Sequence, residues 1–291
     1  MQTDYEFRGD MMKKLIVKLM FISLLVAHAS SADDQSQWRK VNPNSLLVMQ
    51  LESGRVVIEL APEFAPKHVA NIKQLVSDGY FNGAVILRSQ DNYVVQWGHA
   101  ETETSSAKSF GKARKNLKVE FFRNKDELNY RAISSRDSYA DEVGFVDGFT
   151  VASDGKRTWL THCYGMVGVS RGTADDSGNG SGLYVVTGHS PRHLDRNVTL
   201  VGRVIEGMPL LSSLPRGTGP LGFYETPEEY IDIRAIELGD DVEPDSIAYE
   251  IMDTNKELFS EHVSKRTTRS EEWFLESTGK IELCNVGVPS R

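Results

Sequence analysis

Residues 81–98 decide the fold: they read Phe-Asn-Gly-Ala-Val-Ile-Leu-Arg, then Ser-Gln-Asp-Asn, then Tyr-Val-Val-Gln-Trp-Gly. Two apolar runs on either side of a polar turn are typical of two short paired strands. The first strand carries Arg88 and the second carries Gln96. Because an arginine among apolar residues is costly unless it is paired, we expect Arg88 to face a binding site or to form a salt bridge at a rim.

The chain around this segment has a repeated strand pattern. Upstream, two β-rich runs at 46–51 and 55–60 predict a hairpin, and a helix with apolar residues at helical spacing follows it. Downstream, strand-like runs occur at 165–170, 183–187, 198–205 and 230–238, with a short helix predicted near 207–214. Many short strands and few helices favour an antiparallel β-barrel or sandwich. Residues 99–161 are polar without a long periodic run, and we expect a long excursion with short local structure there.

Composition narrows the class of protein. The chain has 291 residues, of which 40% are hydrophobic and 25% are charged, close to an average soluble protein. This excludes collagen-like, disordered and multi-spanning membrane proteins. With 33 basic against 41 acidic residues, the net charge of −8 argues against a general nucleic-acid binder, which needs a basic surface.

The first 32 residues have the order of a secretory signal peptide. Met11-Met12-Lys13-Lys14 is basic, residues 15–27 are mostly apolar, and small residues precede Asp33. We expect translation to start at Met11 or Met12, and the mature chain to be periplasmic without a stable membrane insertion. The other interpretation is an amphipathic helix of the mature protein.

Two further features concern the C-terminal part. Residues 244–291 form an extension, predicted to pack on the core, with a helix from Asp253 or Thr254 to about Trp273 and a strand near 281–288. In an oxidising compartment Cys163 and Cys284 are candidates for a disulfide, which would stabilise the fold by about 4–5 kcal/mol in the chain-entropy model. Two buried free thiols are the alternative.

One motif suggests a different chemistry. Residues 168–172 match the G-x-S-x-G pattern that presents a nucleophilic serine, here Ser170. That pattern requires a helix directly after the serine, whereas here glycines and aspartates follow. A strand end with a small residue is the better interpretation, and no motif for a metal or an organic cofactor is present.

Residues 81–98 resemble the cyclophilins, which are peptidyl-prolyl cis–trans isomerases. Family members carry F-x-G-x-x-F-H-R, a turn and an apolar strand ending in Q-G-G. The family's N-G-S-Q-F-F segment is similar to residues 179–184 here, and its W-L-D segment is similar to residues 193–208. The resemblance covers roughly residues 46–238. It implies a mainly β fold, a closed eight-stranded antiparallel barrel capped by two helices, here with an insertion at about 99–161 and a helical C-terminal extension.

The resemblance also implies roles for individual residues. Arg88 matches the catalytic arginine of the family, and Gln96 matches its substrate-binding glutamine. The matching substrate-binding positions are Tyr93, Val94, Ser170, Tyr184, Leu194 and Val198.

Four positions depart from the family pattern. Ile86 and Leu87 stand where Phe-His is usual, Gly182 replaces a glutamine and His193 replaces a tryptophan. These departures bear on substrate preference, on rate and on binding of the cyclosporin type, and they leave the arginine in place.

The sequence therefore predicts an isomerase that acts without a cofactor on X–Pro bonds in proline-containing segments of exported proteins, by non-covalent stabilisation of the twisted amide. A chaperone-like module that binds such segments with little isomerase activity is the alternative, and a serine hydrolase is a third.

Overall fold

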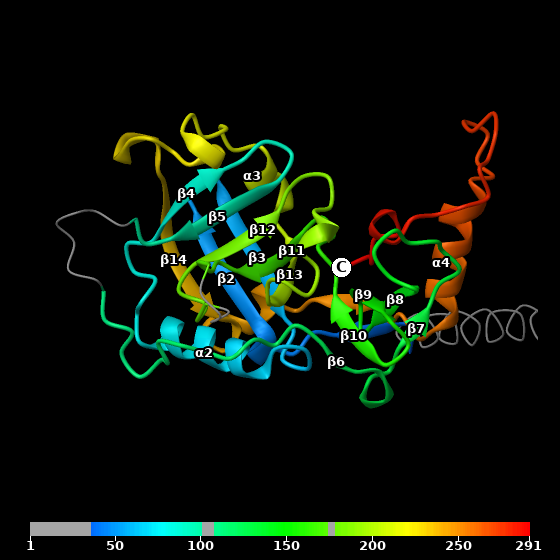
Figure 1. Ribbon diagram of the computed structural model, residues 1–291, viewed down its shortest axis with the longest axis horizontal. Helices are drawn as coiled ribbons and strands as arrows, with labels where there is room; N and C mark the ends of the chain where they lie inside the picture. The colour runs from blue at the N-terminus through cyan, green and yellow to red at the C-terminus, as the bar shows by residue number, and fades with distance from the viewer. Residues whose placement is uncertain (1–35, 101–107, 174–177) are drawn as a thin grey trace, which may run out of the picture.

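The computed structural model describes residues 36–100, 108–173 and 178–291. Within these residues eight antiparallel strands close into a barrel, in the order β11-β12-β5-β4-β14-β2-β3-β13 with β13 paired to β11 (Figure 1). The predicted barrel is thereby confirmed, while the predicted signal peptide at 1–32 lies outside the described residues. The barrel strands are β2 (Leu46–Leu51), β3 (Gly54–Leu60), β4 (Val85–Ser89), β5 (Val94–Gly98), β11 (Met166–Val169), β12 (Leu183–Val186), β13 (Leu200–Glu206) and β14 (Ile231–Leu238).

Two helices flank the barrel, α2 (Pro66–Ser77) and the short α3 (Met208–Ser212). Helix α2 starts with a proline at its first position, where the missing amide hydrogen costs nothing. It ends at Ser77, and two residues later Gly79 has a φ of 68°, the left-handed conformation that closes a helix. Its buried residues Ile72 and Leu75 belong to the barrel core, so the helical spacing predicted from the sequence marks the packed face.

The insertion forms a second sheet, which the sequence analysis did not predict. Strands β6 (Arg123–Asn124), β7 (Arg131–Ala132), β8 (Glu142–Val146), β9 (Phe149–Ser153) and β10 (Arg157–Leu160) are antiparallel, in the order β6-β10-β9-β8-β7 within the described part of the insertion. The strands of this sheet are short and lie between polar loops, so they produce no long periodic pattern in the sequence. For this reason the sequence analysis did not detect them. The predicted excursion with short local structure therefore consists of short strands, which pair into one sheet.

The C-terminal extension contributes a strand and a helix. Strand β15 (Glu250–Met252) pairs with the N-terminal strand β1 (Trp38–Lys40), and α4 (Glu257–Thr268) lies beside the second sheet (Figure 1). The predicted helix was too long at both ends. The observed helix stops at Thr268, because Arg269 adopts the left-handed conformation. The predicted strand near 281–288 is wrong, because Leu283–Asn285 form a 3-10 turn instead.

The insertion and the extension share a second hydrophobic core. Phe259 of α4 packs edge-on against Phe145 of β8, with ring centroids 4.9 Å apart, and Leu283 is fully buried in the same cluster. Met166 and Leu200 at the ends of barrel strands complete it. The extension thus packs on the second sheet as well as on the barrel.

Cys163 and Cys284 form a disulfide that spans 121 residues. It joins the loop before β11 to the 3-10 turn of the extension. The covalent link therefore ties the end of the chain to the barrel. Within the described ranges, none of the helices has the length and apolar character needed to cross a bilayer.

Candidate active site

A β-bulge in β4 turns Arg88 to the outside of the barrel. Ile86 pairs with Trp97, and both side chains are fully buried in the barrel core. Regular alternation would pair Arg88 with Val95 and point it inward, but the register shifts between Ile86 and Arg88. The extra residue lets Arg88 pair with Gln96 and brings both side chains to the same outer face.

Four residues lie in one row across the outer wall. Arg88 on β4 pairs with Gln96 on β5, Gln96 pairs with Tyr184 on β12, and Tyr184 pairs with Gly168 on β11. Directly opposed residues of antiparallel strands present their side chains on the same face, within contact distance. The pairing alone thus brings together the arginine, the glutamine and an aromatic residue from three strands.

The Arg88 guanidinium is held by three hydrogen bonds. Nη1 donates to Gln96 Oε1 at 3.1 Å, Nε donates to the carbonyl of Leu221 at 2.8 Å, and Nη2 donates to Gln90 Oε1. The guanidinium also lies over the ring of Phe223, 5.2 Å from the centroid. A guanidinium has five N–H groups, so two remain without an acceptor among the described residues.

The electrostatic environment of Arg88 favours a partly dehydrated cation. Burial lowers its pKa, and Tyr93, with its ring centroid 5.8 Å away, acts in the opposite direction. Because the ordinary pKa of an arginine lies far above neutrality, the group keeps its charge. The charge therefore acts at a site where water screens it only in part.

Gln96 is oriented by the same contact. Its Oε1 accepts from Arg88, so the amide NH₂ points away from the guanidinium. The half-buried amide is left to donate to another group, such as a peptide carbonyl.

An apolar cluster adjoins this pair. Val94, Tyr184 and Val186 are buried, and Tyr93 and Val198 pack against them. We call these five residues the outer apolar cluster. The sequence predicted four of them, whereas Val186 was missed.

Two other predicted residues lie outside this cluster. Leu194 is half-buried in the turn Arg192–Leu194, next to His193, whose ring stacks on Tyr93 at 6.4 Å. Ser170 follows β11, where its amide donates to the carbonyl of Gly182 at 2.9 Å. Its hydroxyl has no hydrogen-bond partner within the described ranges, so no general base is placed beside it there.

Comparisons with known proteins show which family the chain belongs to. The family model for cyclophilin type peptidyl-prolyl cis-trans isomerase/CLD matches residues 46–238. The chain belongs to the cyclophilin family. As a cyclophilin it is a peptidyl-prolyl cis–trans isomerase, which confirms the enzyme class predicted from the sequence.

Individual relatives are distant. A probable peptidyl-prolyl cis-trans isomerase of Brucella suis is 27% identical over 61% of this chain and 74% of its own length. The corresponding protein of Brucella abortus is 26% identical over the same shares. The crystal structure of a cyclophilin from Hirschia baltica aligns with a TM-score of 0.65 and 25% identity, over 85% of this chain and 94% of that one.

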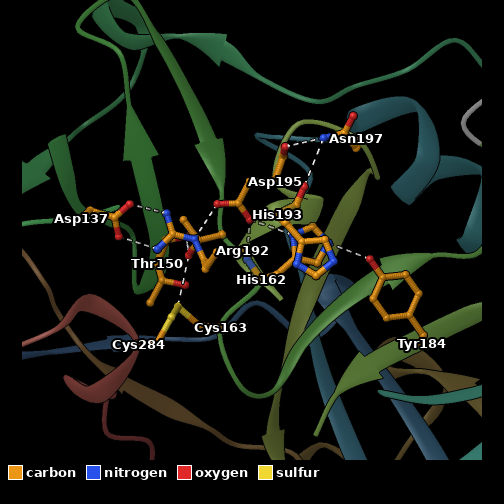
Figure 2. Close-up of polar contacts among 11 residues, drawn as sticks. Asp137, Thr150, His162, Cys163, Tyr184, Arg192, His193, Asp195, Asn197 and Cys284 are labelled. Atoms are coloured by element: carbon orange, nitrogen blue, oxygen red, sulfur yellow. Dashed lines mark hydrogen bonds and ion pairs between the residues drawn. A yellow bond between two sulfur atoms is a disulfide. The ribbon is translucent and has the colours of Figure 1, made fainter. Parts of the chain in front are cut away.

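Beside the outer wall of this cyclophilin, a chain of buried polar side chains runs from Tyr184 to Asp137 of the insertion (Figure 2). Tyr184 contacts His162 at 2.8 Å, and His162 contacts Asp195 at 2.9 Å. Arg192 Nε donates to Asp195 at 2.6 Å, and its two terminal nitrogens donate to Asp137 of the insertion at 2.7 and 3.0 Å. Burial lowers the pKa of Arg192, but the two carboxylates outweigh it and leave a raised pKa.

The sequence analysis missed the groups that hold Arg88 and Tyr184. Leu221 and Phe223 come from the loop after α3, a stretch to which the sequence analysis assigned no role. His162 belonged to no motif because its partners Tyr184 and Asp195 are remote in sequence. Arg192 connects nearby Asp195 to remote Asp137. A buried histidine becomes visible only when the packing around it is known.

Proposed function

We propose that this cyclophilin isomerises X–Pro bonds in exported proteins, with Arg88 as the catalytic residue and Gln96 as the substrate-binding amide. The observation that carries the proposal is the 3.1 Å hydrogen bond between Arg88 Nη1 and Gln96 Oε1, beside the outer apolar cluster. It places a fixed cation, a free amide and an apolar surface next to one another.

The reaction requires no covalent step. Amide resonance gives the X–Pro bond a rotation barrier of about 18–20 kcal/mol, and the uncatalysed reaction takes tens to hundreds of seconds. The enzyme has to bind the twisted amide more tightly than either planar form. In the twisted state the proline nitrogen regains its lone pair and becomes a hydrogen-bond acceptor.

Arg88 supplies the matching donor. Two of its N–H groups have no acceptor in the described residues, while the other three fix the guanidinium plane. A hydrogen bond to the pyramidal nitrogen is stronger in the twisted state than in the planar ground state, so it lowers the barrier. Partial burial of the guanidinium strengthens this interaction.

The remaining residues hold the substrate in place. Gln96 donates its amide to a carbonyl of the substrate, and the outer apolar cluster contacts the proline ring. Leu194 borders the ring, and Ser170 leaves room for the bound backbone. Rotation of the acyl side then proceeds against a fixed proline.

We also propose that the mature protein is periplasmic and begins at Asp33. Two observations support export: the signal-like order of residues 11–32, and the Cys163–Cys284 disulfide, since such bonds persist in oxidising compartments. Its substrates would then be proline-containing segments of exported proteins. Cell fractionation with mass spectrometry of the mature N-terminus tests this, and an uncleaved cytosolic protein would refute it.

The activity test compares wild type with Arg88→Ala on a short X–Pro peptide. Loss of one transition-state donor lowers kcat/KM by about a hundredfold. Arg234→Ala is the matched control, because Arg234 is exposed and its one ion pair among the described residues is with exposed Glu52. Equal activity of all three proteins would refute the role of Arg88, and a folded but inactive wild type would favour the binding module instead.

A further inference from the structure

The hydroxyl group of Tyr184 makes buried contacts that the proposed mechanism does not use. Tyr184 is 7% exposed, and its hydroxyl lies 2.8 Å from Nε2 of the fully buried His162. On the other side, a Cβ placed on Gly168 would lie 2.3 Å from the same oxygen. Gly168 does not have a positive φ, so its backbone would accept alanine. The Tyr184 ring, whose Cζ and Cε1 would lie 2.4 and 2.7 Å from that Cβ, and its hydroxyl together require glycine at this position.

The second partner of His162, Asp195, determines the direction of the hydrogen bond between His162 and Tyr184. Asp195 Oδ1 accepts from the backbone amide of His162 and from Nδ1, both at 2.9 Å. With its proton on Nδ1, the neutral ring has a lone pair on Nε2. The Tyr184 hydroxyl donates to that lone pair, and burial raises its pKa so that it stays protonated.

Asp195 is itself fixed from the far side. Arg192 bridges it to Asp137, and the side chains of all three are at most 5% exposed. His162 also precedes Cys163, which is bonded to the C-terminal extension. The orientation of His162 is thus set by the insertion and by the disulfide-linked tail, as Figure 2 shows.

We propose that His162 is a positioning residue for the isomerase reaction: through the Tyr184 hydroxyl it fixes the aromatic ring against which the substrate's proline binds. This inference rests on the proposed role of Tyr184 in the outer apolar cluster. It connects substrate binding to the insertion, which lies outside the barrel. The ring contacts the proline in every state of the reaction, so its loss of orientation raises KM and leaves kcat unchanged.

Substitution of His162 by asparagine or by glutamine tests its two hydrogen bonds one at a time. The amide of asparagine reaches the position of Nδ1, so His162→Asn keeps the contact with Asp195 and loses Tyr184. The amide of glutamine reaches the position of Nε2, so His162→Gln keeps an acceptor for Tyr184 and loses Asp195. Tyr184→Phe removes only the hydroxyl, and Tyr164→Phe removes a hydroxyl from a half-exposed tyrosine as the matched control.

The experiment measures KM and kcat on an X–Pro peptide for the full mature chain, with the thermal unfolding midpoint of each variant. Tyr184→Phe, His162→Asn and the double variant are each expected to raise KM by about fivefold, the factor that corresponds to one hydrogen bond. The double variant matches the single ones because both substitutions remove the same interaction. His162→Gln and Tyr164→Phe are expected to keep the wild-type KM.

Two results would overturn the inference. In the first, the two KM increases multiply in the double variant. In the second, KM is unchanged and kcat falls in proportion to the folded fraction, as a purely structural role requires. Arg88→Ala in the same series distinguishes failure of the proposed function from failure of this inference. Full activity of that variant refutes the catalytic site. The Tyr184 and His162 variants test the positioning role of His162.

Discussion

The barrel and the second core are built on different principles. Every barrel strand is hydrogen-bonded to a neighbour on each side, and the barrel core consists of strand residues together with buried residues of α2, α3 and the adjoining loops. The second core joins three remote segments: the insertion sheet, α4 and the turn Leu283–Asn285. Because the backbone pairing does not hold these segments together, side-chain contacts and one disulfide have to do so.

This difference assigns different roles to charged residues. On the outer wall of the barrel, Arg88 keeps N–H groups free of described acceptors. Between barrel and insertion, Arg192 uses three nitrogens on the carboxylates of Asp137 and Asp195. A buried cation whose charge is balanced by two buried carboxylates serves the structure, while a partly buried cation that contacts only neutral oxygens among the described residues is available to a substrate.

The disulfide is expected to carry the largest share of the second core's stability. Cys284→Ser opens a loop of 121 residues, which costs about 4–5 kcal/mol of unfolding free energy in the chain-entropy model. Denaturant unfolding of oxidised wild type, reduced wild type and the variant measures this cost. Reduced wild type should match the variant, and an unchanged midpoint in both would contradict the dependence on the covalent link.

Phe259→Ala tests whether the two cores unfold separately. The substitution removes a fully buried ring and costs about 4 kcal/mol, because a cavity remains between α4 and β8. Hydrogen exchange is expected to show faster exchange in β8 and β9 with β2 and β3 still protected. Phe81→Ala in the barrel core is the matched variant, and equal loss of protection everywhere in both would contradict separate cores.

Glu120 of the insertion caps the first turn of helix α2, which packs on the barrel. Helix α2 has no side-chain cap of its own, and Glu120 accepts from the amides of Lys67 and His68 at 3.1 and 3.0 Å. Burial alone would raise the pKa of Glu120, but hydrogen bonds from His68 and Lys67 outweigh it and lower the pKa. A carboxylate with a lowered pKa stabilises the fold above its unfolded pKa, and this contribution disappears as the pH falls through the folded pKa.

Glu120→Gln is therefore expected to cost about 1 kcal/mol at neutral pH, the size of a helix-cap contact. The difference from wild type should shrink as the pH falls below the ordinary glutamate pKa of 4.5. Thermal unfolding at several pH values measures it. A difference that stays constant down to low pH would show that the charge of Glu120 contributes nothing.

The sequence by itself indicated a barrel or sandwich, and the family resemblance then selected the barrel and the candidate site residues. Short apolar runs between turn residues predicted the strands, and residues 81–98 together with 179–184 and 193–208 indicated the family. These signals are local: alternation and turn residues reflect how neighbouring residues pack, and this information lies within a few positions along the chain.

Only the tertiary structure decided which way these residues face and what holds them. The bulge at Ile86–Arg88 depends on the pairing of β4 with β5, and it determines whether Arg88 lies inside or outside the barrel. The second sheet depends on burial against α4, far along the chain. The role of His162 could not be recognised in the sequence, because Tyr184, Asp195 and the insertion come together only when the chain folds. Such contacts depend on cross-strand register and packing between remote segments, for which a local pattern carries no information.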